Sequence, residues 1–447
     1  MSILEPVLPS KYDLKYFEEK HKKKYEGLSN TQFIIHAGKS GCPFYEQFNA
    51  YLDADVIVFN SLKYKFETIL NRKPKTEVEI VDECDEFLDS FSNSKTIHVE
   101  KLGYSLGQLL LQEKSLMPII SELQEILLYL KNDTRINNAI KTGEIIPIKE
   151  TGVYDLLKTI AKNPELTLDV DDDNYLTKVE ETAKMFEDLL DEAYITITKQ
   201  EQSILIHVVT TNLEKKFKEM LDKNKVFVLM SGTLHSEEVL KNIFGLTDYS
   251  IVDAEVESQG EITIKRSKKE IDCKYSNFRE LIHTREQYLR LLDESVKVAK
   301  KPCLIHVNAF SDLPSEKEKR EYELNNLISQ DEIKKNQEIN VEHQVIEEFK
   351  RGDRSILFST KVSRGIDFPG EECNSIVFTK YPNPDVSEAF WKILMKTKPQ
   401  HYWSFYKDKA HRELLQKIYR GLRFKGDTVE VLSPDKRVLD FFENNKI

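Results

Sequence analysis

The chain has 447 residues, of which 40% are hydrophobic and 32% charged, and these values are typical of an ordinary folded protein with several domains. With 15 glycines and 14 prolines, a fibrous or low-complexity chain is excluded. No apolar run approaches the roughly 20 residues that span a bilayer, and the start lacks the basic and apolar regions of a signal peptide. We therefore expect a cytoplasmic protein with no membrane partner.

The cysteines are odd in number, far apart and without a C-x-x-C pair, so the sequence supports neither a disulfide framework nor a closed zinc site. We expect reduced thiols at all five positions, which are Cys42, Cys84, Cys273, Cys303 and Cys373.

The net charge of −11 by itself argues against wholesale binding to nucleic acid, but the charge is unevenly distributed. Residues 164–194 carry a net charge of −9, whereas residues 392–425 carry +8. Aromatic residues in or beside the basic segment suit phosphate contact with base stacking, or else they belong to a core below a solvated helix face. They are Trp391, Tyr402, Trp403, Phe405, Tyr406 and Tyr419.

Short apolar runs of strand length alternate with helical patterns, which predicts an α/β fold with parallel sheets and crossover helices. Between about Leu106 and Tyr194 strand signals are few, and apolar residues between Ile119 and Leu130 recur at helical spacing, which predicts a helical insertion. The charged stretch 314–342 is expected to form exposed helices and loops. The expected strands are residues 56–59, 78–81, 226–230, 304–307, 356–358, 375–378 and 429–432.

The first candidate motif, Asp82-Glu83-Cys84-Asp85, follows the expected strand at 78–81. An aspartate at the carboxyl end of a strand can hold Mg²⁺ through water, and a neighbouring glutamate can polarise the attacking water. A plain alternative is a helix N-terminus whose dipole favours acidic residues.

The second candidate, Ser231-Gly232-Thr233, ends the expected strand at 226–230. Its hydroxyl groups can hydrogen-bond the acidic residues at a neighbouring strand end. The alternative is a turn in which Thr233 caps the following helix.

Two further candidates lie near the C-terminus. Ser359, Thr360 and Lys361 follow a buried strand, and Gly365 allows a ligand to approach the backbone next to Asp367. Arg420 and Arg423 lie three residues apart, so on a helix both could clamp phosphate oxygens, although an exposed basic helix explains the pair equally well. No single alternative explains all four motifs in this order.

From about Gly41 to Lys436 the sequence resembles the XPD/DinG-like helicases of superfamily 2. The segments DECD at Asp82, SGTL at Ser231, STKVSRGIDFPG at Ser359 and QKIYRGLR at Gln416 look like motifs II, III, V and VI. CPFY at Cys42, followed by ADVIVFNSLKY at Ala54, is similar to the segment that begins with the last cysteine of the family's iron-sulfur domain.

The resemblance implies two RecA-like motor domains, the first incomplete, with a helical arch, in an ATP-dependent helicase that unwinds duplex DNA by moving along single-stranded DNA. The implied division is an iron-sulfur remnant at 1–50, motor domain 1 at 51–100 and 201–260, the arch at 101–200, and motor domain 2 at 261–447.

By the same resemblance Asp82 coordinates Mg²⁺, Glu83 activates water, and Arg420 and Arg423 reach the γ-phosphate of ATP. The implied nucleotide-binding residues are Asp85, Gly365, Asp367 and Gln416, and the residues implied in coupling and DNA contact are Ser231, Gly232, Thr233, Ser359, Thr360 and Lys361.

The main departure from the family is the phosphate loop, G-x-x-x-x-G-K-[ST], of which the sequence has no complete copy. Gly38-Lys39-Ser40 lacks the first glycine, replaced by Phe33, and Lys39 lies only 43 residues before Asp82. We therefore expect a chain that begins after motif I, hydrolyses ATP negligibly alone, and has an apolar sheet edge that needs a partner. The missing N-terminal part is either a separate helicase polypeptide or a part of the same gene that the sequence does not include. Cys42, a lone remnant, cannot hold a 4Fe-4S cluster.

Smaller departures are Cys84, Arg364 and Tyr419, which stand where the family usually has Ala, Glu and Gly. A non-catalytic nucleic-acid-binding or scaffold protein that kept the helicase fold remains an alternative. A remodeller that acts on RNA is another.

Overall fold

The computed structural model describes residues 7–10, 22–36, 42–92, 94–167, 174–201, 203–252, 260–360, 362 and 365–445. The chain forms two compact units: unit 1 comprises Met1–Asp248 with Asp385–Trp403, and unit 2 comprises Tyr249–Pro384 with Ser404–Ile447. Residues 385–403 thus join unit 1, whereas the sequence-based division placed all of 261–447 in one domain.

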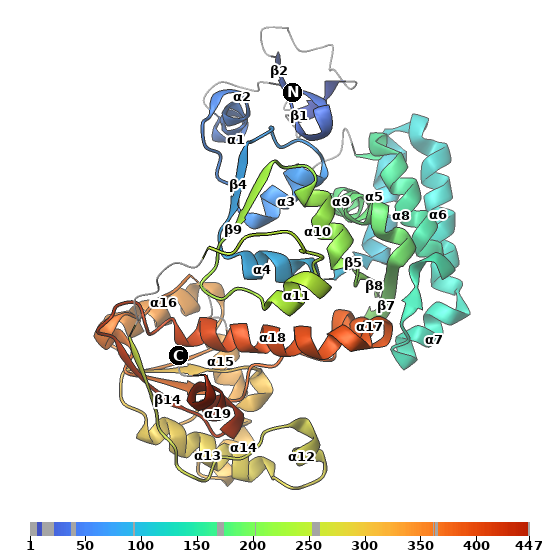
Figure 1. Cartoon of the computed structure of the whole chain (residues 1–447). Coiled ribbons are helices and arrows are strands. Elements are labelled where there is room, and N and C mark those ends of the chain that lie inside the picture. The colour runs from blue at the N-terminus through green and yellow to red at the C-terminus, as the bar shows by residue number, and fades with distance from the viewer. Residues whose placement is uncertain are drawn as a thin grey trace. The chain divides into compact units, whose positions relative to one another are not determined.

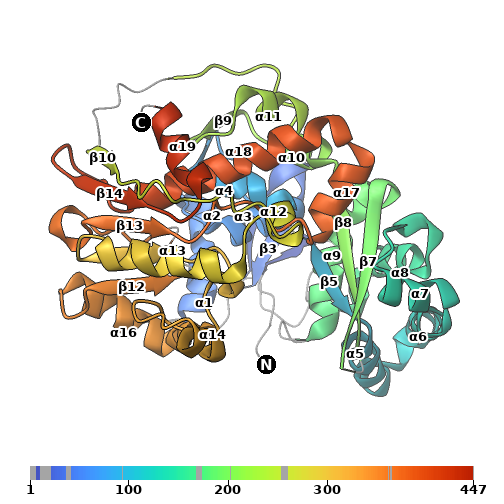
Figure 2. The same ribbon diagram turned by 90° about the horizontal axis from the view of Figure 1, so that it is seen from below.

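Unit 2 is built on a five-stranded parallel sheet with the order β10-β14-β13-β11-β12 (Figure 2). Alternate residues of its strands enter two separate cores: Leu304 and Ile376 pack on one face, and Ile305 and Val377 on the other. Both faces are therefore covered, as parallel sheets require. The strands are β10 (Glu261–Ile264), β11 (Cys303–His306), β12 (Ile356–Ser359), β13 (Ser375–Phe378) and β14 (Thr428–Leu432).

The helices of unit 2 form the layers on this sheet. Those on one face contribute residues such as Phe349, Leu414 and Val438, and α13 contributes Leu289 and Leu292 on the other. The helices that lie wholly in unit 2 are α12 (Tyr275–Arg279), α13 (Arg285–Val298), α14 (Glu316–Glu321), α15 (Gln330–Asn336), α16 (Ile339–Lys350) and α19 (Lys436–Asn444).

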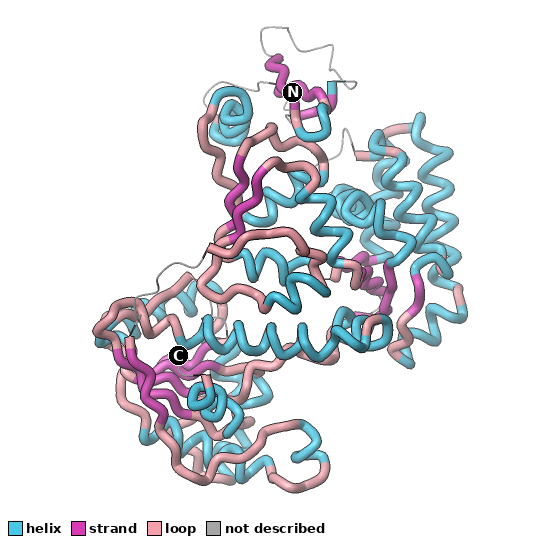
Figure 3. Tube along the Cα trace, viewed as in Figure 1, coloured by secondary structure: helices cyan, strands magenta, loops and turns pink. Residues whose placement is uncertain are grey.

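The parallel sheet of unit 1 has only two strands in the described part of the chain, β4 (Val78–Val81) and β9 (Val226–Leu229) (Figures 1 and 3). On one side the rings of Phe217 in α10 and Phe227 in β9 meet with centroids 6.0 Å apart. The apolar side chains on the other face remain exposed: Val78, Ile80, Val226, Val228 and Met230 are 52%, 64%, 49%, 36% and 46% accessible. The described part of unit 1 therefore leaves one apolar face of this sheet open.

A helical subdomain lies between β4 and β9 in the sequence. Five helices pack around one core with an antiparallel sheet of order β5-β8-β7-β6, in which β7 and β8 pair over their full length. The predicted helical spacing between Ile119 and Leu130 falls in α6, whereas the sequence analysis missed the antiparallel strands. The elements are β5 (Lys95–His98), α5 (Val99–Gln112), α6 (Met117–Asn132), α7 (Thr134–Thr142), β6 (Ile146–Pro147), α8 (Gly152–Lys162), α9 (Tyr175–Phe186), β7 (Ala193–Gln200) and β8 (Ser203–Thr210).

The N-terminal part of unit 1 holds a small antiparallel sheet of order β1-β3-β2. Residues 56–59 form no strand, and Val56 and Val58 are 79% and 90% exposed, so that expected strand was wrong. Gly38-Lys39-Ser40 and Gly41 lie outside the described residues. The remaining elements of unit 1 are β1 (Val7–Pro9), β2 (Lys22–Glu26), β3 (Gln32–His36), α1 (Pro43–Glu46), α2 (Ala50–Asp53), α3 (Ser61–Ile69), α4 (Cys84–Asp89), α10 (Leu213–Leu221), α11 (Glu237–Asn242) and α17 (Ala389–Thr397).

The predicted fold class, α/β with parallel sheets, is confirmed. The other six expected strands coincide with β4, β9, β11, β12, β13 and β14 to within a residue or two. No helix in the described part of the chain is both long enough and apolar enough to cross a bilayer.

Candidate functional site

In unit 1 the strand β4 ends in a sharp turn at Asp82 and Glu83. Glu83 has φ +48° and ψ +48°, a left-handed conformation that costs energy in any residue but glycine, and α4 begins directly after it. One oxygen of Asp82, Oδ1, accepts the Glu83 N–H at 2.9 Å. The turn thus places two carboxylates at the carboxyl end of the strand.

The acidic residue that contacts the second motif is Asp85, which is fully buried. Ser231 Oγ donates to Asp85 Oδ1 at 2.8 Å, and Thr233 Oγ1 donates to Oδ2 at 3.1 Å. The backbone adds two further bonds, from Met230 N–H to Val81 C=O and from Cys84 N–H to Met230 C=O, both at 2.9 Å. The structure therefore brings the Asp82–Asp85 and Ser231–Thr233 segments into direct contact.

The plain alternatives for these two segments fare differently. Ser236, rather than Thr233, caps α11 by accepting the Val239 N–H, so the capping alternative for Thr233 was wrong. Asp85 and Glu86 do lie in the first turn of α4, as the helix-dipole alternative expects.

Asp82 offers a suitable site for part of a magnesium shell. Its side chain is exposed and makes no ion pair in the described part of the chain, which leaves Oδ2 open to solvent. Mg²⁺ in phosphate-transfer sites takes one or two carboxylates together with phosphate oxygens and water. Asp82 therefore fits a metal that a nucleotide brings with it.

In unit 2 the hydroxyl residues after β12 are occupied within the fold. The buried Ser359 Oγ accepts the Val362 N–H at 3.1 Å, and Thr360 Oγ1 donates to Gln337 Oε1 at 2.8 Å. Gly365 has φ +74°, which favours glycine at this position. Lys361 and Arg364 lie outside the described residues.

Both arginines of the last motif converge on one carboxylate oxygen. Arg420 Nη1 and Arg423 Nη2 donate to Asp367 Oδ1 at 2.8 and 2.5 Å, and Arg420 Nη2 donates to Gln416 Oε1 at 3.3 Å. The expectation that a helix aligns the pair was wrong, because α18 (Pro399–Ile418) ends before them and a turn brings them together. Arg420 is only 4% exposed, so an exposed basic helix does not describe it either.

The electrostatics of Asp367 favour the charged form. Burial alone raises the pKa of this carboxyl, but the hydrogen bonds from Arg423 and Arg420 outweigh it and hold the pKa below its usual value. Arg423 is one-third exposed, and its Nε–H is buried without a hydrogen-bond partner in the described part of the chain. A buried donor of this kind suits an acceptor that binds from outside.

Asp427 is a further residue of this site, and the sequence analysis missed it. Its Oδ2 accepts the N–H groups of Arg423 and Phe424 at 2.7 and 2.9 Å, and its Oδ1 accepts the Gly370 N–H at 3.1 Å. This buried carboxylate ties the turn that carries Arg423 to the loop that follows Asp367. The Gly426-Asp427 pair before β14 was the available signal, because aspartate often bonds the backbone of a turn.

The basic segment 392–425 lies in α17, α18 and the turn that follows. Trp391, Tyr402 and Phe405 are buried, so for these three the core alternative holds over base stacking. Besides Arg420 and Arg423, which share Asp367, two further cations have acidic partners in the described part of the chain: Arg412 pairs with Asp408 at 2.8 Å and Lys417 with Glu413 at 3.2 Å. Trp403 is 56% exposed, and its ring lies edge-on to Tyr402 with centroids 5.0 Å apart.

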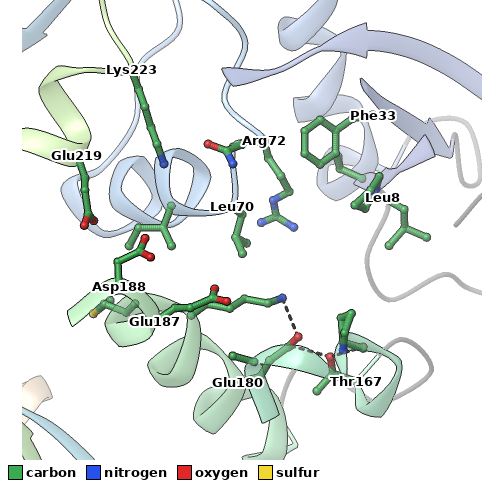
Figure 4. Close-up of a pocket in the computed structure, with 18 residues that line it drawn as sticks. Leu8, Phe33, Leu70, Arg72, Thr167, Glu180, Glu187, Asp188, Glu219 and Lys223 are labelled. Carbon is green, nitrogen blue, oxygen red and sulfur yellow. Dashed lines mark hydrogen bonds and ion pairs between the residues drawn. The ribbon is translucent and has the colours of Figure 1, made fainter. Parts of the chain in front are cut away.

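A cavity of about 420 Å³ in unit 1 is lined by none of the predicted site residues (Figure 4). Glu180 in its wall accepts a hydrogen bond from Thr167 at 2.6 Å and pairs with Lys184 at 2.7 Å. All five cysteines are free thiols, and four of them are buried while Cys42 is half-buried.

Comparison with known proteins identifies the class of this fold. Residues 292–445 match the family model of a helicase C-terminal domain. One similar solved structure is "XPD_Helicase", with 15% sequence identity and a TM-score of 0.52; the match covers 91% of this chain and 74% of the other. Another is the "Structure of S. tokodaii Xpd4", with 16% identity and a TM-score of 0.54, and this match covers 90% of this chain and 77% of the other. A search of curated protein sequences finds no match.

Residues 292–445 therefore match a helicase C-terminal domain, and the chain shares the fold of these XPD structures, in keeping with the resemblance that the motifs indicated. The helicase C-terminal domain coincides with most of unit 2, including Asp367, Arg420 and Arg423.

Proposed function

We propose that this protein is an ATP-dependent DNA helicase of the XPD/DinG type, which moves along single-stranded DNA and unwinds duplex DNA. The helicase C-terminal domain indicates a helicase-type function. The observation that carries the finer proposal is the convergence of Arg420 and Arg423 on Asp367 within that domain.

The arginines suit recognition of a phosphate. A guanidinium group offers five N–H donors in a planar fork that matches phosphate oxygens. Arg423 uses one Nη for Asp367, and its buried Nε–H has no partner among the described residues, so a γ-phosphate of ATP would provide an acceptor. Asp367 holds the two side chains in place until the nucleotide arrives.

The residues of unit 1 supply the other half of the chemistry. Asp82 holds the Mg²⁺ that accompanies ATP, and this ion neutralises phosphate charge. Glu83 orients and polarises the attacking water. Ser231 and Thr233 are bonded to Asp85, so a shift at the strand end moves the Ser231–Thr233 segment, and we assign them the coupling to DNA.

We further propose that a segment outside the 447 residues, in a second polypeptide or in a longer form of this one, supplies the phosphate loop. Each charge-assisted hydrogen bond to phosphate contributes roughly 1.5–3 kcal/mol, so the loop's lysine and amides account for most of the nucleotide affinity. The open apolar face of β4 and β9 requires a covering layer, and parallel strands with crossover helices provide one. The proposed partner is therefore an α/β polypeptide that contains G-x-x-x-x-G-K-[ST].

The test is reconstitution of ATPase activity. This chain is mixed with candidate phosphate-loop polypeptides from the same organism, and ATP hydrolysis is measured with and without single-stranded DNA. We expect DNA-stimulated hydrolysis that Glu83→Gln and Arg420→Ala abolish. Arg320→Ala, at an exposed position of unit 2, serves as the control and leaves the rate unchanged.

The competing function is a non-catalytic nucleic-acid-binding protein. It predicts that DNA binding ignores ATP and survives Glu83→Gln and Arg420→Ala, and that no phosphate-loop polypeptide produces ATPase activity. Competition between single-stranded DNA and RNA for the protein separates a DNA helicase from an RNA remodeller.

A further inference from the structure

A second, smaller cavity in unit 1, of about 180 Å³, is enclosed by α3, the turn after α4, β5, α9 and α10 with the turn that follows it. Its charged lining is four lysines against a single acidic residue, Glu219. No motif of the sequence analysis includes Glu219 or any of the four lysines. The lysines are Lys65, Lys95, Lys216 and Lys223.

The lysines have only neutral partners in the described part of the chain. Lys65 Nζ donates to Phe87 C=O at 3.3 Å and to the Ser90 hydroxyl, Lys216 Nζ donates to Phe91 C=O at 3.4 Å, and Lys223 Nζ donates to Thr68 C=O at 3.1 Å. None of the four forms an ion pair with a described carboxylate. Each ammonium group has three N–H donors, so most of these donors remain unused.

Two of the ammonium groups share one aromatic ring. Lys65 Nζ and Lys216 Nζ lie 4.8 and 5.9 Å from the centroid of Phe91. Lys65 also lies 4.7 Å from Phe87, and Lys216 lies 5.1 Å from Phe186. Aromatic faces attract cations, but they carry no net charge to offset the repulsion between neighbouring lysines.

The titration behaviour agrees with an excess of positive charge. Burial lowers the pKa of Lys216 to about 7, with further lowering by Lys65 and Lys95. Burial and Lys95 lower the pKa of Lys65 to about 8. The acidic groups that act on this cluster from the surrounding elements, Glu86, Asp188 and Glu219, do not restore either value.

We propose that this lysine pocket binds a phosphate group, either as a small phosphate anion or as part of a nucleic-acid backbone. Lysine binds phosphate as a point charge, and several unpaired ammonium groups around one cavity favour an anion with more than one charge. The volume is below the roughly 300 Å³ at which pockets for drug-sized ligands begin, so one or two phosphoryl groups fit and a whole nucleotide does not. The inference does not rest on ATP hydrolysis or on a partner polypeptide.

The first experiment measures binding of pyrophosphate to the full chain by calorimetry. Lys216→Met keeps the length of the side chain and removes one charge, and we expect at least about tenfold weaker binding because one charge-assisted hydrogen bond is lost. Lys218→Met, at an exposed position of the same helix, is the matched control and keeps the affinity of the wild type. If Lys216→Met does not fold, Lys95→Met carries the same expectation.

A second readout distinguishes phosphate binding from a merely structural role. A bound anion raises the pKa of Lys216 and Lys65, so binding at pH 8 takes up protons, and the apparent binding enthalpy depends on the ionisation enthalpy of the buffer. Lys216→Met reduces that dependence. Absence of saturable pyrophosphate binding at millimolar concentration, or equal affinity of wild type and Lys216→Met, overturns the proposal.

A third experiment measures single-stranded oligonucleotide binding and identifies the source of the phosphate. If Lys216→Met weakens single-stranded oligonucleotide and pyrophosphate binding together, and the two compete, the pocket holds a backbone phosphate. If the variant loses only pyrophosphate binding, the pocket holds a free phosphate anion. Both results support the pocket, and neither depends on whether the proposed helicase activity is correct.

Discussion

The two parallel sheets of this protein have similar strands but different surroundings. In unit 2 the adjacent residues Ile376 and Val377 of β13 are both fully buried, because helices cover both faces of a five-stranded sheet. In unit 1 the adjacent residues Ile80 and Val81 of β4 are 64% and 9% exposed. Unit 2 thus contains a layered core with both sheet faces covered, whereas the described part of unit 1 has a strand-end motif on a sheet with one face open.

The largest effect is expected at the arginines of the complete unit. In the reconstituted enzyme Arg423→Ala removes a hydrogen-bond donor to the phosphate, and arginines of this kind contribute a factor of about 10³–10⁵ to the rate. The rate constant kcat is measured under DNA saturation, alongside urea unfolding to show that the fold is kept. A loss of less than about tenfold contradicts the assigned role.

The open face is tested by one substitution made in each sheet. Ile376→Ala in unit 2 leaves a cavity and is expected to lower the free energy of unfolding by about 2–5 kcal/mol. Ile80→Ala in unit 1 is expected to change it by no more than about 0.5 kcal/mol, because the side chain is already exposed. Urea unfolding followed by circular dichroism measures both. A comparable loss of unfolding free energy in the two variants would mean that the face of β4 is covered, which contradicts the difference between the two sheets.

The link between the two motifs of unit 1 is expected to have an intermediate effect. Thr233→Val keeps the shape of the side chain but leaves Asp85 Oδ2 without its hydroxyl donor, at a cost of about 1–3 kcal/mol. Both tryptophans, Trp391 and Trp403, lie in unit 1, so their fluorescence during urea unfolding reports on this unit. Thr134→Val, at an exposed position of the same unit, is the control.

A further effect is a pH dependence that differs between the units. The pKa values of Lys216 and Lys65 are lowered in the folded state to about 7 and about 8, so the unfolded chain binds more protons above these values. The stability of unit 1 should therefore rise as the pH increases from about 7 towards the unfolded lysine value of about 10.4. The lowered pKa of Asp367 in unit 2 acts in the other range: its contribution is present above about 3.9 and is lost as the pH falls through the folded value.

Urea unfolding followed by tryptophan fluorescence at several pH values in this alkaline range measures the stability of unit 1. In Lys216→Met the rise of stability with pH should be smaller. An equal rise in wild type and variant means that Lys216 is not its source.

The sequence indicated four of the five strands of unit 2, because apolar runs of strand length alternate there with helical patterns, but it missed β10. It also indicated that the hydroxyls of Ser231 and Thr233 reach an acidic strand end. It missed β7 and β8, whose alternating pattern lies at the edge of a helical region. It wrongly placed a strand at residues 56–59, which have apolar residues of high strand propensity but no strand to pair with in the described part of the chain. Turn geometry was also beyond it, because the approach of Arg420 and Arg423 depends on where α18 ends and on Asp427, which holds the turn.

The central claim is that these 447 residues contain helicase motifs but no complete phosphate loop, so that they do not hydrolyse ATP by themselves. The most direct test is steady-state ATP hydrolysis by the purified chain with saturating single-stranded DNA, compared with its Glu83→Gln variant. We predict no DNA-stimulated hydrolysis and no difference between the two proteins. Hydrolysis at helicase-like rates that Glu83→Gln abolishes contradicts the claim.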